Sequence, residues 1–188
     1  MELLDVMKKR FSVRKYKEQQ VEPEKLAKIL EAAHVAPTAT NAQPVRLIVV
    51  QSEVGRAKLD KAARLYGAPT VIIVCADHDK AWVRKYDQMQ TTDIDASILT
   101  DHMMLEATEQ GLGSLWVCWF DPKIVREEFE LPDNLEPINL LALGYADTEE
   151  KGPDRHKTER ISLDELVEKG LDRKDRTGML KILCKPGM

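Results

Sequence analysis

Near the N-terminus, Arg10, Ser12 and Arg14 alternate along the chain and carry side chains well suited to binding phosphate. In an extended backbone alternate side chains point the same way, so two guanidinium groups and one hydroxyl would share a face. Guanidinium groups donate paired hydrogen bonds to phosphate oxygens, and a serine hydroxyl can donate to a remaining oxygen. The spacing indicates an anion site, although a basic cluster is also typical of a solvated surface.

A second polar segment, residues 37–44, reads Pro-Thr-Ala-Thr-Asn-Ala-Gln-Pro and contains no charged side chain. Its amide and hydroxyl groups suit the polar edge of a flat heterocycle, and it runs directly into an apolar stretch, where ligand-binding loops often lie. Composition alone would also fit a helix stop followed by a loop. Together with the arginines, the segment indicates one phosphorylated aromatic cofactor held at both ends.

Other side chains with redox or metal chemistry have simpler explanations. Cys118 lies in an apolar stretch, where a cysteine is usually an inert core residue. The histidines show no metal-ligand spacing, and Asp93 and Asp95 fit capping and dipole interactions at a helix start. The Gly-Leu-Gly sequence at 111–113 follows a helix, so it predicts a helix C-cap and no dinucleotide fingerprint. The sequence therefore predicts no catalytic side chain and no metal site.

Strands and helices that could position these segments alternate along the chain, which indicates a layered α/β or α+β domain. Nearly continuous apolar runs predict buried strands over residues 45–51 and 70–76, and two further strands are predicted over residues 115–120 and 138–145. Helical spacing, prolines and capping residues predict helices over residues 3–9, from Pro23 to before Pro37, 53–64, 93–110, from Asp121 to Phe129, and a short one opening at Ser162.

The composition is that of an ordinary globular protein. The 188 residues, 43% hydrophobic and 32% charged, suffice for one domain with a sizeable core. A net charge of −4 gives no electrostatic reason to expect a nucleic acid partner. No apolar stretch approaches the ~20 residues that span a bilayer. With three widely separated cysteines, these features favour a cytoplasmic protein without nucleic acid or membrane partners.

Four motifs, in this order, resemble the nitroreductase family of flavin enzymes. They are Arg-x-Ser-x-Arg at 10–14, Pro-Thr-x-x-Asn-x-Gln-Pro at 37–44, Gly-Leu-Gly-Ser at 111–114 and Leu-Ala-Leu-Gly-Tyr at 141–145. A basic residue before the last helix, Arg160, also matches, and the resemblance covers about residues 1–168. It implies an α+β, three-layer fold with a central mixed, mainly antiparallel sheet flanked by helices. It also implies an intertwined homodimer, a FMN-binding domain over residues 1–170 and a C-terminal tail over 171–188.

The resemblance implies one FMN at each of two subunit interfaces. Carried over to this chain, Arg10, Ser12 and Arg14 would hold the phosphate and ribityl end, with Phe11 contributing mainly backbone. Arg160 would close on the phosphate from the other end of the chain, with His156 and Lys157 as competing candidates.

The flavin ring would be held by two further segments. Pro37, Thr38 and Ala39 of the partner subunit would cover the ring, and Asn41 would hydrogen-bond its polar edge. The backbone of Val117, Cys118 and Trp119 would lie along the reactive side, with an N–H near flavin N5. Preorganised donors at these places stabilise the reduced ring.

The implied activity is transfer of hydride from NADH or NADPH through flavin N5 to a small aromatic, electron-poor acceptor such as a nitroaromatic or quinone, by a ping-pong mechanism. Trp82, Tyr86 and Trp119 could stack on that acceptor, with ordinary packing an equal alternative. Two departures from the family pattern stand out: Val45 in place of a large aromatic alters packing more than chemistry, and the lack of Glu-Gly near Trp119 places the chain in a smaller subgroup. The alternatives are a flavin-dependent dehydrogenase, a reductive dehalogenase or a non-catalytic flavin-binding protein.

Overall fold

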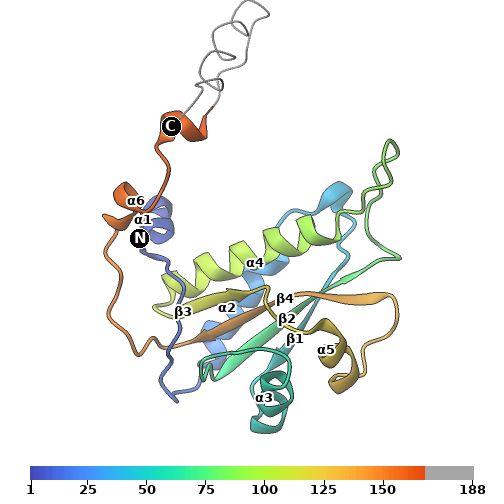
Figure 1. Ribbon diagram of the computed structural model, residues 1–188, viewed down its shortest axis with the longest axis horizontal. Coiled ribbons are helices and arrows are strands. Elements are labelled where there is room, and N and C mark those ends of the chain that lie inside the picture. The colour runs from blue at the N-terminus through green and yellow to red at the C-terminus, as the bar shows by residue number, and fades with distance from the viewer. Residues whose placement is uncertain (168–188) are drawn as a thin grey trace, which may run out of the picture. The chain divides into compact units, whose positions relative to one another are not determined.

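A four-stranded antiparallel sheet forms the centre of the chain in this computed structural model, which describes residues 1–167 (Figure 1). Its spatial order is β1-β2-β4-β3, and every neighbouring pair of strands is antiparallel. The second strand is buried at every position because it is central in the sheet and covered on both faces. The strands are β1 (Val45–Val50), β2 (Thr70–Asp77), β3 (Gly113–Val117) and β4 (Leu135–Gly144).

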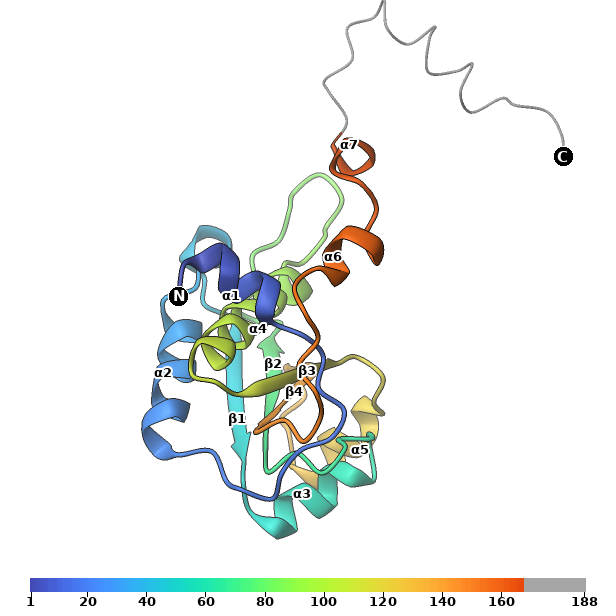
Figure 2. The ribbon, with the colours of Figure 1, turned by 90° about the vertical axis from the view of Figure 1, so that its left-hand side faces the viewer.

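Helices cover both faces of this sheet and complete the three layers implied by the sequence (Figure 2). Ile72 and Val74 pack with α2 and α4 on one face, and Val71 and Ile73 pack with α3 and α5 on the other. Each such buried side chain contributes about 1.5–3 kcal/mol. The helices of this part of the chain are α1 (Leu3–Lys9), α2 (Pro23–His34), α3 (Glu53–Asp60), α4 (Thr92–Glu109) and α5 (Pro122–Glu128), with a 3-10 turn at η1 (Ala39–Asn41).

The segment that contains the alternating arginines lies along the outer edge of β3. Ser12 and Ser114 form a parallel bridge, and the N–H of Val13 donates to the carbonyl of Ser114 at 3.0 Å. Further on, Tyr16 forms an antiparallel bridge with Ala146 beyond β4. The mixed character of the sheet therefore rests on the parallel Ser12–Ser114 bridge, while the four strands themselves pair in the antiparallel sense.

Two strand boundaries differ from the prediction. The third strand ends at Val117 instead of residue 120, because the N–H of Asp121 donates to the carbonyl of Ala62 at 3.0 Å and draws the chain off the sheet. The fourth strand begins at Leu135, before Pro137, because the pairing with β2 shifts register there. Proline lacks the N–H needed in a regular ladder, and an irregularity of this kind tolerates it.

The chain divides into two compact units, Met1–Lys151 and a second that begins at Gly152. The second contains α6 (Arg155–Thr158) and α7 (Leu163–Leu166). The predicted capping box is confirmed: Ser162 Oγ accepts the N–H of Glu165 at 3.2 Å, and the Glu165 carboxylate accepts the N–H of Ser162 at 3.0 Å. The predicted boundary at residue 170 and the tail 171–188 lie outside the described residues.

Candidate functional site

A glycine allows the alternating segment to lie close to β3. A Cβ atom at Gly113 would be 2.5 Å from Val13 Cγ2, closer than any real side-chain contact. Val13 is fully buried, and Phe11 packs against the same core cluster. Neighbouring residues of an extended segment face opposite ways, so this alternation would put Arg10, Ser12 and Arg14 on the face away from Val13.

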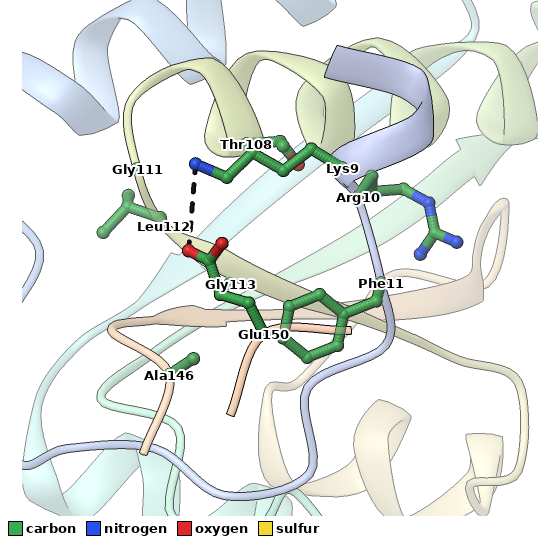
Figure 3. A pocket seen from close by; sticks show the side chains of 9 residues that line it. All are labelled: Lys9, Arg10, Phe11, Thr108, Gly111, Leu112, Gly113, Ala146 and Glu150. Carbon is green, nitrogen blue, oxygen red and sulfur yellow. Dashed lines mark ion pairs between the residues drawn. The ribbon is translucent and has the colours of Figure 1, made fainter. Parts of the chain in front are cut away.

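A pocket opens beside Arg10, where α4 ends and β3 begins (Figure 3). The helix ends at Glu109, and Gly111, just after its C-cap, has a φ of 76°, the left-handed conformation that glycine adopts without strain. Lys9 points toward Glu150 and pairs with it at 3.8 Å, whereas the Arg10 guanidinium points away from that pair (Figure 3). The pocket is lined by Lys9, Arg10, Phe11, Thr108, Gly111, Leu112, Gly113, Ala146 and Glu150.

The polar segment 37–44 lies at the opposite end of α4. The N–H of Ala39 donates to Asp95 Oδ1 at 2.9 Å, and Asp95 is in the first turn of that helix. An 18-residue helix is about 27 Å long. The structure therefore does not bring the arginine segment and the loop 37–43 together within one chain.

The loop 37–43 holds three residues in the left-handed region. Thr40, Asn41 and Gln43 have φ values of 51°, 58° and 50°, and none of them is glycine. Asparagine tolerates this conformation, but a β-branched threonine does so at a cost of about 1–3 kcal/mol. Inside the loop, the N–H of Gln43 donates to Thr38 Oγ1 at 3.1 Å. Strain of this kind is often found where a loop contacts a ligand.

The segment expected beside the flavin ring is only partly in the sheet. Val117 is the last residue of β3 and is buried, whereas Cys118 and Trp119 are exposed. The interpretation of Cys118 as an inert core cysteine is therefore wrong, because the chain leaves the sheet one residue earlier. The Trp119 side chain is 94% exposed, which leaves a large apolar surface open.

Two other aromatic candidates lie on a protruding arm, residues 78–91. Tyr86 is 98% exposed and Trp82 37% exposed, and a Val83–Gln90 bridge closes the arm. At its base, the His78 ring contacts Gln90 Oε1 at 2.6 Å and Glu136 Oε2 at 2.5 Å. The hydrogen bond to Gln90, which has the larger effect, and the hydrogen bond to Glu136 raise the pKa of His78 above its ordinary value.

The remaining predicted contacts belong to the second unit. His156 lies in α6 and is half-buried, and Arg160 follows that helix and is exposed. Their assignment to the phosphate stays a prediction, as does that of the neighbouring Lys157.

Sequence reasoning missed several residues at both ends of α4. Lys9, Thr108 and Glu150 line the pocket, and the only sequence signal near them was the Gly-Leu-Gly turn at 111–113. Asp95 lies in the first turn of α4, as the sequence predicts, but it is also buried and accepts a hydrogen bond from the loop 37–43, which the sequence does not indicate. Asp93, two residues earlier, is exposed, which is what we expect of a charged residue at the start of a helix.

Comparison with known proteins identifies the family of this chain. Residues 7–65 and 61–145 match the model of the family described as Nitroreductase family. A solved structure of a nitroreductase family protein from Clostridium difficile 630 is 55% identical, with a TM-score of 0.88 over 89% of this chain and 98% of that one. The chain belongs to the nitroreductase family.

Two other relatives of this nitroreductase-family chain have names that mention FMN. A Bacillus subtilis protein named FMN reductase (NAD(P)H) is 28% identical, over 83% of this chain and 73% of that protein. The solved structure of an FMN-dependent nitroreductase from Clostridium difficile is 29% identical, with a TM-score of 0.68 over 86% of this chain and 98% of that one. None of the described helices is long and apolar enough to cross a membrane.

Proposed function

We propose that this chain passes hydride from NADH or NADPH through FMN to an electron-poor acceptor, a nitroaromatic or a quinone, in two half-reactions at one site. As a member of the nitroreductase family, it is an FMN-dependent oxidoreductase that uses NAD(P)H. The observation that carries the proposal is the face of Arg10, Ser12 and Arg14, which Gly113 allows to lie against the sheet edge.

The residues present fit the anionic end of FMN. Two guanidinium groups and a hydroxyl supply donors for phosphate oxygens, and the buried Val13 and partly buried Phe11 fix the backbone that carries them. When bound, FMN supplies the ring position that takes up hydride and gives it to the second substrate. The main-chain N–H groups of residues 117–119 would donate to the ring, so the chain needs no acidic side chain near it.

We infer further that the site is shared between two copies of the chain. Within one copy, the arginine segment and the loop 37–43 are about a helix length apart, which exceeds the length of one FMN. Pro37, Thr38, Ala39 and Asn41 would therefore come from the second copy. The apolar face of α1 supports a homodimer, because Leu3, Leu4 and Met7 are 62%, 60% and 42% exposed and line or adjoin an apolar groove against α4.

Anaerobic mixing tests this function. FMN-loaded protein is combined with NADH and with NADPH, and the flavin absorbance should bleach within seconds and return when a nitroaromatic is added. A flavin that stays oxidised with both donors would instead favour a dehydrogenase, a reductive dehalogenase or a flavin-binding protein. Light scattering should give twice the 21.4 kDa mass of one chain.

A further inference from the structure

Asp95 is a fully buried carboxylate that joins the start of α4 to the loop 37–43. Its Oδ1 accepts the N–H of Ala39 at 2.9 Å, and its Oδ2 accepts the Thr91 hydroxyl at 3.0 Å. Among the described residues, no ion pair involves this carboxylate. Burial of a charge is costly, so the two donors and the positive end of the helix dipole must stabilise it.

The hydrogen bond from Ala39 to Asp95 is the long-range contact of this loop. Between Pro37 and Gln43, the other hydrogen bonds of the described residues join positions no more than five apart. Ala39 begins the turn η1, and the left-handed residues Thr40 and Asn41 follow directly. A loop with this strain keeps its conformation only where its surroundings determine it. The position of Asn41 therefore depends on the carboxylate of Asp95.

We propose that Asp95 is a positioning residue for the cofactor, acting through Ala39 and the loop. This inference rests on the proposed function, in which the loop covers FMN bound by the second copy. Asp95 itself does not touch the ring: it fixes the backbone that aims Asn41 at the polar edge of the flavin. Without the hydrogen bond from Ala39 to Asp95, FMN would have to order the loop as it binds, and the reduced ring would lose a preorganised donor.

Three variants separate this role from general effects on the helix. Asp95→Ala removes both acceptors. Asp95→Asn keeps an oxygen for Ala39, and its amide can donate to Thr91, whose hydroxyl can turn to the carbonyl of Trp82 at 3.4 Å. Asp93→Ala is the matched control, because it removes an equal charge from an exposed position in the same turn. The expected order of FMN affinity is wild type and Asp93→Ala together, then Asp95→Asn close behind, and Asp95→Ala last.

The measurement is FMN titration of the full chain by flavin fluorescence, with the midpoint potential of the bound flavin and the melting temperature recorded for each variant. Asp95→Ala should weaken FMN binding by about tenfold, the effect of one hydrogen bond to a charged acceptor. It should also shift the midpoint potential to more negative values, because the reduced flavin ring loses more stabilisation than the oxidised ring does. Asp95→Asn should keep both the FMN affinity and the midpoint potential close to those of wild type. A merely structural defect in α4 would not explain that difference between the two variants.

The outcomes distinguish this inference from the proposed function. A wild-type chain that binds no FMN contradicts the proposed function itself. A wild-type chain that binds FMN, with Asp95→Ala equal to it in affinity and potential, overturns the role of Asp95. If Asp95→Ala does not fold, Asp95→Ser takes its place, because serine suits a first helical turn but its hydroxyl is one bond too short for Ala39. Equality of Asp95→Ser with wild type would overturn the inference in the same way.

Discussion

Arg14 is the residue that tests the phosphate site most directly, because it is exposed and its replacement leaves the core intact. Arg14→Ala should weaken FMN binding by about 1.5–3 kcal/mol, the range for a hydrogen bond to a charged group. The difference from wild type should narrow as salt is added, because ions screen the lost contact. FMN titration at two salt concentrations measures both effects.

Lys15→Ala is the matched control for that experiment. Lys15 is the next residue, is also exposed and pairs with Asp147 at 2.6 Å on the surface. An exposed ion pair contributes little to stability, and its loss should leave FMN binding unchanged. Equal FMN affinity in Arg14→Ala and Lys15→Ala would mean that the phosphate lies elsewhere.

Gly113 makes a second prediction at the residue scale. Gly113→Ala places a Cβ atom 2.5 Å from Val13 Cγ2, so the arginine segment must move away from β3. Overpacking of this kind destabilises a protein by about 1–3 kcal/mol, and FMN binding should weaken as well. The double variant Gly113→Ala/Val13→Ala removes the 2.5 Å contact and leaves a Cβ–Cβ distance of 3.1 Å, so it should bind FMN more tightly than Gly113→Ala. Melting curves check the destabilisation by Gly113→Ala and FMN titrations check the binding, and a double variant that binds FMN no better than Gly113→Ala contradicts the steric cause.

Individual residues show what the sequence could and could not predict. The shared face of Arg10, Ser12 and Arg14 follows from local alternation, which needs no knowledge of the fold. The burial of Asp95 and the exposure of Cys118 depend on where distant segments run, namely the loop at Ala39 and the bond from Asp121 to Ala62. Tertiary contacts of this kind leave no mark in the local pattern.

Among the elements, the arm 78–91 should respond to pH through His78 at its base. Both ring nitrogens lie against oxygen atoms, so the protonated ring can donate to Gln90 and Glu136 together. Because these bonds raise the pKa of His78 in the folded state, their stabilisation is complete below its unfolded pKa of about 6.5. It is lost as pH rises through the higher folded value. The amplitude should be small, because the His78 side chain is 37% exposed.

Melting temperatures from about pH 5 to pH 9 test this behaviour of the arm. The difference between wild type and His78→Asn should be largest at the acidic end and should vanish at the alkaline end. Glu136→Gln, which removes the charged partner, should reduce that pH dependence. Curves for wild type and His78→Asn that run parallel across the whole range would exclude His78 as the titrating group.

Strands and helices were predictable to different degrees. The continuous apolar runs at β1 and β2 and the long helix α4 were predicted within one or two residues, because each is set mainly by its own sequence. The end of β3 and the start of β4 were not. The end of an edge strand depends on its neighbouring strand and on competing hydrogen bonds. Pro137 made the sequence pattern start β4 three residues too late.

At the scale of the whole molecule, the length of α4 decides how a site can be built. Its two ends carry the two segments predicted to hold FMN, the arginine face near Gly113 and the loop near Asp95. The sequence alone showed the two motifs but gave no distance between them. The rigid helix supplies that distance, and a site that uses both segments therefore requires two chains.

Mixed dimers test this arrangement without a structure of the complex. One chain carries Arg14→Ala, and its partner carries Asn41→Ala. If each site combines the arginine face of one chain with the loop of the other, one site receives both changes and the second receives neither. The mixed dimer should then bind one FMN with wild-type affinity, although each homodimer of a variant binds FMN weakly at both sites. A site formed within single chains would receive one change in each copy, and titration of the mixed dimer would then show no tight site at all.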